Sequence, residues 1–346
     1  LDEVPVASLM RADGTLNEER FPNFARLADA GTWYRNASAV APNTPLSVPT
    51  ILDGKLPPPG GLPTSTDHPE SLFTLLGGSY DLDVTETVTE LCPGSACAPA
   101  EPESLGDLFS RLGRSFSDAT VVYGHASLPT DVREGLPAVD QSWGGFIDDT
   151  GPDALEAPPS PISGEDPLDE TQAEFLARQV EERSGQYPEL DGETLREAIA
   201  QSSVRGDDDL LFVHEVFPHF PWVRTPTGAI YENRAGPPGR ARRGVWGDNE
   251  FLVTQGLQRH LLQLGYADLA LGDLIDKLEE DGVWDDALVV VTADHGISFE
   301  PGQATRQPDD DNRHAVYRVP LFIKAPGDEG GIVDDDPAST IDVLPT

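Results

Sequence analysis

The sequence predicts an α/β protein in which helices cover both faces of a parallel-type sheet. Apolar residues recur at helical spacing over residues 256–282, a length that strands do not reach, and Gly282 stands where a helix should end. The near-continuous apolar runs ALVVVTAD (287–294) and VPLFIKAP (319–326) follow, as expected for strands that are buried on both faces. In such sheets the ligand site lies beyond the carboxyl ends of the strands.

Weaker patterns of the same kind precede this region. They predict helices over residues 104–114 and 171–185, and strands over residues 119–124 and 209–217. Two excursions interrupt the pattern, a loop-rich one over residues 55–103 and an acidic, proline-rich one over residues 147–170. We therefore expect one domain over residues 1–346. The abrupt ends of the sequence indicate a domain trimmed from a longer protein.

The composition excludes some classes of partner. The 346 residues include 61 acidic and 23 basic ones, and the net charge of -38 repels nucleic acid and anionic lipid headgroups. Only three of the basic residues are lysines, which suits a salty or calcium-rich milieu and equally a GC-rich genome. The longest apolar run is too short to cross a bilayer, so any export signal or membrane anchor is expected outside this sequence.

The two cysteines, Cys92 and Cys97, enclose a Pro-Gly turn in LCPGSAC. This turn brings them within reach of a disulfide, although two free thiols are the alternative. Two sulfurs alone cannot complete a structural zinc site. A disulfide would place the protein outside the cytoplasm.

Asp294 and His295 stand together at the end of the predicted strand 287–294. One hard oxygen and one imidazole nitrogen suit manganese, zinc or magnesium. The alternative is a hydrogen-bonded loop without a metal. A metal would need further oxygen ligands, which Asp2 and Glu3 supply if a sheet strand precedes them.

Thr44 and Pro45 form a typical start of a helix in APNTPLSVPTILDG (41–54). The Thr44 side chain would then lie at the positive end of that helix, where backbone N–H groups hold anions. Alternatively, Thr44 is only an N-cap. Pro49 indicates that the helix is short or kinked.

Histidines follow two other predicted strands or loops. His214 and His219 flank the end of the strand 209–217, and His314 with the preceding Asn312 approaches the same edge of the sheet. A single histidine there would fit a core or surface position equally well, and two at one edge make a site as good an interpretation as these.

Taken together, these residues resemble the sulfatase-like branch of the alkaline phosphatase superfamily. The resemblance rests on RFPNFARLADAGTWYRNASA (20–39), FPHFPW (217–222), residues 266–296, RVPLFIKAPG (318–327) and IDVLPT (341–346). This branch includes lipoteichoic acid synthases and phosphoglycerol transferases, and the LCP…C loop is similar to that of actinobacterial membrane-linked members. The resemblance implies a three-layer αβα sandwich around a largely parallel central sheet.

The resemblance also implies roles for individual residues. The implied metal ligands are Asp2, Glu3, Thr44, Asp294 and His295. Thr44 falls where the family places its nucleophile, ten residues before Gly54. His219, with His214 as second choice, is expected to protonate the leaving oxygen or to activate the acceptor. Substrate contacts are expected from Asn43, Asn312 and His314.

Thr44 also bears on the kind of ester. Sulfatases proper oxidise a cysteine or serine to formylglycine within a motif that continues with proline and arginine, whereas this sequence has TPLSVP. A threonine nucleophile is typical of the phosphotransferring branches. Their two-zinc members carry a histidine four residues after an aspartate, and here Gly272 follows Asp268 at that spacing. One divalent metal ion, Mn, Mg, Zn or Ca, is therefore expected.

The sequence thus predicts a metal-dependent hydrolase or transferase of phosphate esters, of the phosphoglycerol type, whose substrate is a small molecule or is linked to lipid. The expected location is extracytoplasmic, with membrane attachment through segments outside this chain. Two alternatives remain open: a sulfate-ester hydrolase that works without formylglycine, and a catalytically silent extracytoplasmic binding module.

Overall fold

The computed structural model describes residues 1–57, 61–97, 193–202, 206, 208–231, 239 and 244–344. The helices are η1 (Val6–Leu9), α1 (Pro22–Ala30), α2 (Thr44–Asp53), α3 (Leu72–Leu76), α7 (Glu193–Gln201), α8 (Glu250–Glu280), α9 (Arg313–Tyr317) and η2 (Thr340–Asp342). The strands are β1 (Thr32–Tyr34), β2 (Ala37–Ser38), β3 (Asp81–Glu86), β4 (Asp209–His214), β5 (Val289–Thr292), β6 (Leu321–Lys324), β7 (Ile332–Asp334) and β8 (Ala338–Ser339). The elements predicted over 104–114, 119–124 and 171–185, and the acidic excursion 147–170, lie outside the described residues.

The strands form a mixed arrangement. A four-stranded sheet has the order β5-β6-β1-β7. Parallel pairs join β1 to β7, β2 to β8 and β3 to β4, whereas β6 runs antiparallel to both β1 and β5. The predicted α/β class is confirmed, with the difference that β6 is antiparallel. β6 follows β5 after a loop and the short helix α9 and pairs with it in antiparallel register.

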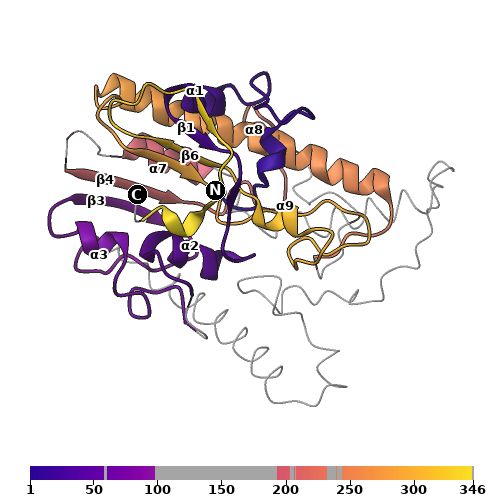
Figure 1. Ribbon diagram of the computed structural model, residues 1–346, viewed down its shortest axis with the longest axis horizontal. Coiled ribbons are helices and arrows are strands. Elements are labelled where there is room, and N and C mark those ends of the chain that lie inside the picture. Colours follow the sequence, from indigo (N-terminus) through magenta and orange to yellow (C-terminus); the bar gives the residue numbers. More distant parts are fainter. Residues whose placement is uncertain are drawn as a thin grey trace, which may run out of the picture.

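Helices cover both faces of the strands, and the side chains of β4 show it directly. Leu211 and Val213 pack into the core that includes residues of α1, α7 and α8. Their neighbours Leu210 and Phe212 pack against residues of α2 and α3. Because successive side chains of a strand point to opposite faces, β4 is buried on both sides. Figure 1 shows α1 and α8 on one side of the strands and α2 and α3 on the other.

The long helix α8 begins at the N-cap Asn249, whose side chain accepts from two backbone N–H groups. It ends before Gly282, which has the positive φ of 74° common after a helix. Asp268, buried in the middle of α8, accepts hydrogen bonds from the backbone N–H groups of Asn23 (3.0 Å) and Phe24 (2.9 Å) at the start of α1. This carboxylate therefore stabilises the N-terminus of α1, which accounts for an aspartate in an otherwise apolar stretch.

Cys92 and Cys97 form a disulfide, as predicted, with their Cα atoms 6.0 Å apart. Glu86, at the end of β3, accepts from the backbone N–H groups of Leu91 and Cys92 and so holds the disulfide loop against the sheet. Within the described part of the chain, no helix has the length and apolar character needed to span a bilayer.

Candidate metal and active site

The first residues of the chain lie between the segments that follow β4 and β5. The Asp2 N–H donates to the Phe217 carbonyl oxygen (3.0 Å), and the Asp294 N–H donates to the Leu1 carbonyl oxygen (3.0 Å). Leu1 and Asp2 are therefore hydrogen-bonded to both segments. This pairing brings the acids that open the sequence to the edge where the Asp-His pair ends β5.

Asp2, Asp294 and His295 form one buried group, here called the carboxylate group. Each offers a ligand atom, and these atoms all lie within 4.8 Å of one another. His295 Nε2 lies 3.4 Å from Asp2 Oδ1 and 3.8 Å from Asp294 Oδ2. All three side chains are almost completely buried. The structure thus brings together three of the residues that the sequence predicts as metal ligands.

The orientation of His295 directs a lone pair into this group. Its Nδ1 lies 2.9 Å from the Gly296 carbonyl oxygen, an acceptor that requires Nδ1 to carry the proton. In the neutral form of the ring, Nε2 is then the nitrogen with the free lone pair, and it faces the two carboxylates. Asp2 Oδ1, Asp294 Oδ2 and His295 Nε2 are buried and have no hydrogen-bond partner in the described part of the chain. Burial, followed by the charges of Asp294 and Glu3, raises the pKa of Asp2 well above its ordinary value.

This donor set fits a divalent cation. Two carboxylate oxygens and one imidazole nitrogen are ligands that manganese, magnesium, zinc and calcium accept to different degrees. A cation placed among them would satisfy the three unpartnered atoms and relieve the repulsion between the acids. The hydrogen bond from His295 Nδ1 to a backbone carbonyl is the usual outer-shell support of a metal-bound histidine.

Thr44 is the first residue of α2, and its side chain faces the carboxylate group. Its hydroxyl donates to Asp2 Oδ2 at 3.4 Å and is buried. The N-cap is the preceding residue, Asn43, whose Oδ1 accepts from the Leu46 N–H (3.3 Å). The reading of Thr44 as a cap is therefore wrong, because Asn43 performs that role and leaves the threonine hydroxyl directed at Asp2.

A second polar cluster lies beside the first and contains Glu3, His219 and Arg306. Glu3 Oε1 is 3.4 Å from both His219 Nε2 and Arg306 Nε, and Glu3 Oε2 accepts from the Phe220 N–H (3.2 Å). Arg306 Nη1 is also 3.4 Å from His219 Nε2. Glu3 has a φ of 59°, in the left-handed region that costs a non-glycine residue of order 1–3 kcal/mol. This turn of the backbone lets consecutive residues, Asp2 and Glu3, serve two neighbouring clusters.

The second predicted histidine, His214, ends β4 and is buried near Asp294. Burial is the main reason that its pKa falls to about 4. Its imidazole is therefore neutral at pH 7. Neither ring nitrogen has a hydrogen-bond partner among the described residues.

The three predicted substrate-binding residues lie in different environments. Asn43 caps α2, as described above. The Asn312 amide is engaged within its own loop, since its Nδ2 donates to the carbonyl oxygens of Ala304 (2.9 Å) and Gln307 (3.0 Å). His314 is exposed on α9. The structure does not place the Asn312 amide or the His314 ring among the buried ligand atoms.

Two residues near the site are absent from the sequence-based prediction. Arg306 lies in an irregular loop after the Asp-His pair. Its only distinguishing feature in the sequence is that it is a basic residue close to the acidic run 309–311. Gln263 of α8 is completely buried, and its Oε1 accepts from the N–H groups of Val223 (2.8 Å) and Arg224 (3.1 Å). Its Nε2 donates to the His219 carbonyl oxygen (3.0 Å). Gln263 therefore fixes the turn that carries His219.

Comparison with known proteins identifies the family of the chain. Residues 8–346 match the family model described as "Sulfatase". A segment of 87 residues is 34% identical to lipoteichoic acid synthase 1 of Bacillus subtilis strain 168, and it spans 23% of this chain and 14% of that protein. The matched segment is thus a small part of that relative.

Solved structures share the fold. The phosphonate monoester hydrolase of Silicibacter pomeroyi aligns over all of this chain and 70% of its own, with a TM-score of 0.54 and 18% identity. A 2-O GAG sulfatase aligns over all of this chain and 67% of its own, with a TM-score of 0.55 and 13% identity. At these identities the similarity shows a common α/β architecture.

Proposed function

The chain belongs to the sulfatase family, and we propose that it is a metal-dependent enzyme that cleaves or transfers a phosphate ester group with Thr44 as its nucleophile. The observation that carries this proposal is the convergence of the carboxylate group on the Thr44 hydroxyl. Three buried lone-pair donors and a buried hydroxyl, drawn from three separate regions of the chain, meet at one edge of the sheet.

One divalent ion would be held by Asp2, Asp294 and His295, with Thr44 and Glu3 as further candidate ligands. When bound, such an ion lowers the pKa of a nearby hydroxyl and neutralises charge on a phosphate oxygen. The acids need this neutralisation, because Asp2, Glu3 and Asp294 otherwise repel an anionic substrate. Manganese, magnesium, zinc and calcium are the candidates.

The chemistry of the chain's own residues starts at Thr44. Its Oγ1 attacks phosphorus, so that a bond from Oγ1 to phosphorus forms while the bond from phosphorus to the leaving oxygen breaks. The hydroxyl proton has an acceptor in Asp2 Oδ2, 3.4 Å away. Water or an acceptor alcohol then takes the phosphoryl group from Thr44 and restores the hydroxyl.

The second cluster, Glu3, His219 and Arg306, would supply the proton for the leaving oxygen and a positive charge for the phosphate. His219, whose Nε2 faces Glu3, would protonate the leaving oxygen and later activate the acceptor. His214 is the second choice for this role, but its pKa of about 4 makes it a poor proton donor at pH 7. Arg306 would bind a phosphate oxygen through its guanidinium, which is rich in N–H donors.

Phosphate is preferred over sulfate because Thr44 cannot be converted to formylglycine. The family match and the fold shared with a 2-O GAG sulfatase favour a sulfate-ester hydrolase as the second candidate. A catalytically silent binding module that retains the metal is the third. The Thr44 hydroxyl is directed at Asp2, and this favours an enzyme over a silent binding module.

We also propose an extracytoplasmic location, with membrane attachment through segments outside this chain. The disulfide between Cys92 and Cys97 supports an oxidising compartment. The segment similar to a lipoteichoic acid synthase supports a small or lipid-linked substrate. The charge of -38 argues against nucleic acid as a partner.

A panel of chromogenic esters tests this function. Metal-stripped protein would be reloaded separately with each candidate ion and mixed with 4-nitrophenyl phosphate, bis(4-nitrophenyl) phosphate, 4-nitrophenyl phenylphosphonate and 4-nitrophenyl sulfate. We expect metal-dependent release of nitrophenolate from a phosphorus ester, abolished in Asp294→Asn. Turnover of the sulfate alone would favour the second candidate, and bound metal without any turnover would favour the binding module.

A further inference from the structure

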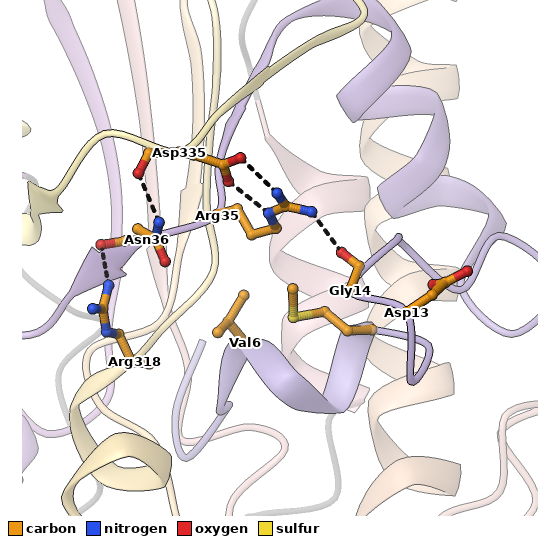
Figure 2. A pocket seen from close by; sticks show the side chains of 8 residues that line it. Val6, Asp13, Gly14, Arg35, Asn36, Arg318 and Asp335 are labelled. Atoms are coloured by element: carbon orange, nitrogen blue, oxygen red, sulfur yellow. Dashed lines mark hydrogen bonds and ion pairs between the residues drawn. The ribbon is translucent and has the colours of Figure 1, made fainter.

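A cavity of about 630 Å³ lies apart from the carboxylate group and shares no lining residue with it. Figure 2 shows it between η1, the turn that follows η1, and the end of β1. The lining residues used here are Val6, Met10, Arg35, Asn36, Arg318 and Asp335. Its volume is that of a site for a small organic molecule. We call it the Arg318 pocket.

One of the two arginines in the pocket is already neutralised. The Arg35 guanidinium donates from Nε and Nη2 to both carboxylate oxygens of Asp335, at 2.7 and 2.6 Å, and from Nη1 to the Gly14 carbonyl oxygen at 3.0 Å (Figure 2). Such a bidentate pair fixes the side chain and consumes its charge. Arg35 therefore forms a wall of the pocket rather than an anion-binding group.

Arg318 differs in its partners. Its Nη1 donates to the Asn36 carbonyl oxygen (2.6 Å), which is neutral. Among the residues that the structure describes, no carboxylate lies within ion-pair distance of Arg318, although the chain has 61 acidic and only 23 basic residues. An arginine has five N–H donors, so most of its capacity to bind an oxyanion is unused by these contacts. Among the described residues its positive charge has no ion-pair partner.

The backbone holds Arg318 in this position. Its carbonyl oxygen accepts from the Val6 N–H (2.9 Å), and its own N–H donates to the His314 carbonyl oxygen (3.2 Å). Val6, which is 7% exposed, and the half-buried Met10 add apolar side chains to the lining. The pocket thus combines the Arg318 guanidinium with an apolar surface, and its lining also includes the exposed carboxylate of Asp13, which lies away from Arg318 beyond Gly14 (Figure 2).

We propose that the Arg318 pocket binds a small organic anion, with its carboxylate or phosphate head on the Arg318 guanidinium and its apolar part against Val6 and Met10. A guanidinium matches the planar or tetrahedral oxygens of such a head. The apolar walls exclude a purely inorganic anion as the best ligand, because they would gain nothing from it. This binding site is independent of the proposed function.

Saturation-transfer NMR titrations of the metal-loaded protein with hexanoate test the proposal, with hexanol as the uncharged probe. We expect hexanoate to bind at least tenfold more tightly than hexanol. Arg318→Gln should weaken hexanoate binding at least tenfold, and Arg318→Lys should restore part of it. Met10→Glu, which adds an acid to the apolar wall at similar length, should also weaken it.

The proposal would be overturned by equal affinity for hexanoate and hexanol, by unchanged hexanoate affinity in either Arg318→Gln or Met10→Glu, or by no binding to the parent protein. Asp294→Asn should bind hexanoate as the parent does, since it alters only the carboxylate group. Loss of binding in Asp294→Asn would place the probe at that group and would also contradict the proposal. Thermal unfolding of each variant confirms that it is folded.

Discussion

His295 Nε2 lies 3.4 Å from Asp2 Oδ1, although the two residues stand near opposite ends of the chain. Both atoms are buried, and neither has a hydrogen-bond partner among the residues that the structure describes. Unpartnered polar atoms of this kind are costly in a protein interior, and a bound cation would remove that cost for both at once.

Replacing one acid of this group should therefore abolish stabilisation by metal. Ligand at one hundred times its dissociation constant stabilises the parent by about 2.7 kcal/mol. Asp2→Asn keeps the shape of the side chain but loses the charge, so we expect little rise in melting temperature on addition of Mn²⁺. Calorimetric melts with and without the ion measure this. Asp276→Asn, which removes an exposed acid of α8, should keep the full rise, and an equal rise in Asp2→Asn would be evidence against the metal site.

Asn43 should act through the stability of α2 and not through the substrate. Its Oδ1 caps the helix, so Asn43→Ala should lower the free energy of unfolding by about 1 kcal/mol. Asn43→Asp retains an acceptor oxygen and should lose much less. Denaturant titration compares the two variants. A raised KM in Asn43→Ala at unchanged stability would return this residue to the substrate-binding set.

Gln263 should influence turnover through the position of His219. Gln263→Met keeps a side chain of similar length but removes its hydrogen bonds to the 218–224 turn. Misplacement of a catalytic group by about 1 Å can reduce the rate up to about a hundredfold. We expect a lower kcat with the metal-induced rise in melting temperature retained. Gln263→Glu keeps the acceptor for Val223 and Arg224 and should recover part of the rate. A variant that melts earlier yet turns over at the parent rate would show a purely structural role.

His260 should make the protein less stable at mildly acidic pH. Burial lowers its pKa from 6.5 to about 4, so the unfolded chain binds the proton more readily than the folded one. The contribution of the neutral His260 to the free energy of unfolding is then fully present above pH 6.5 and is lost as the pH falls toward 4. The loss between pH 7 and pH 5 is about 2 kcal/mol. Denaturant titrations at both values should show a smaller loss in His260→Gln. Equal losses in the variant and the parent would exclude this histidine as the cause.

The strand-end position of Asp294 and His295 could be predicted from sequence, because an apolar run that stops at polar residues marks the carboxyl edge of a sheet. Asp2 was only a conditional candidate until the family resemblance singled it out, since the hydrogen bonds that join Leu1 and Asp2 to residues 294 and 217 are long-range contacts. The cap of α2 was misassigned because Asn43 and Thr44 are both good cap residues and Pro45 fits the first or the second helical position.

Arg306 and Gln263 lay beyond the reach of sequence patterns for different reasons. Arg306 stands in an irregular loop, where no periodicity indicates its direction. Gln263 lies in the amphipathic helix α8, where a glutamine is normally assigned to the solvent-exposed face. Only the packing of the 218–224 turn against α8 buries it.

The most direct test of the central claim is intact-protein mass spectrometry after rapid mixing of the metal-loaded protein with an activated phosphate ester. We expect a phosphoryl adduct in the intact mass and, after digestion of the quenched protein, on the peptide that contains Thr44, because its buried hydroxyl faces Asp2. Thr44→Ser should form the adduct more slowly, and Thr44→Val, which keeps the branched shape without the hydroxyl, should form none. A Thr44→Val protein that folds, binds metal and still turns over the ester near the parent rate would contradict a threonine nucleophile.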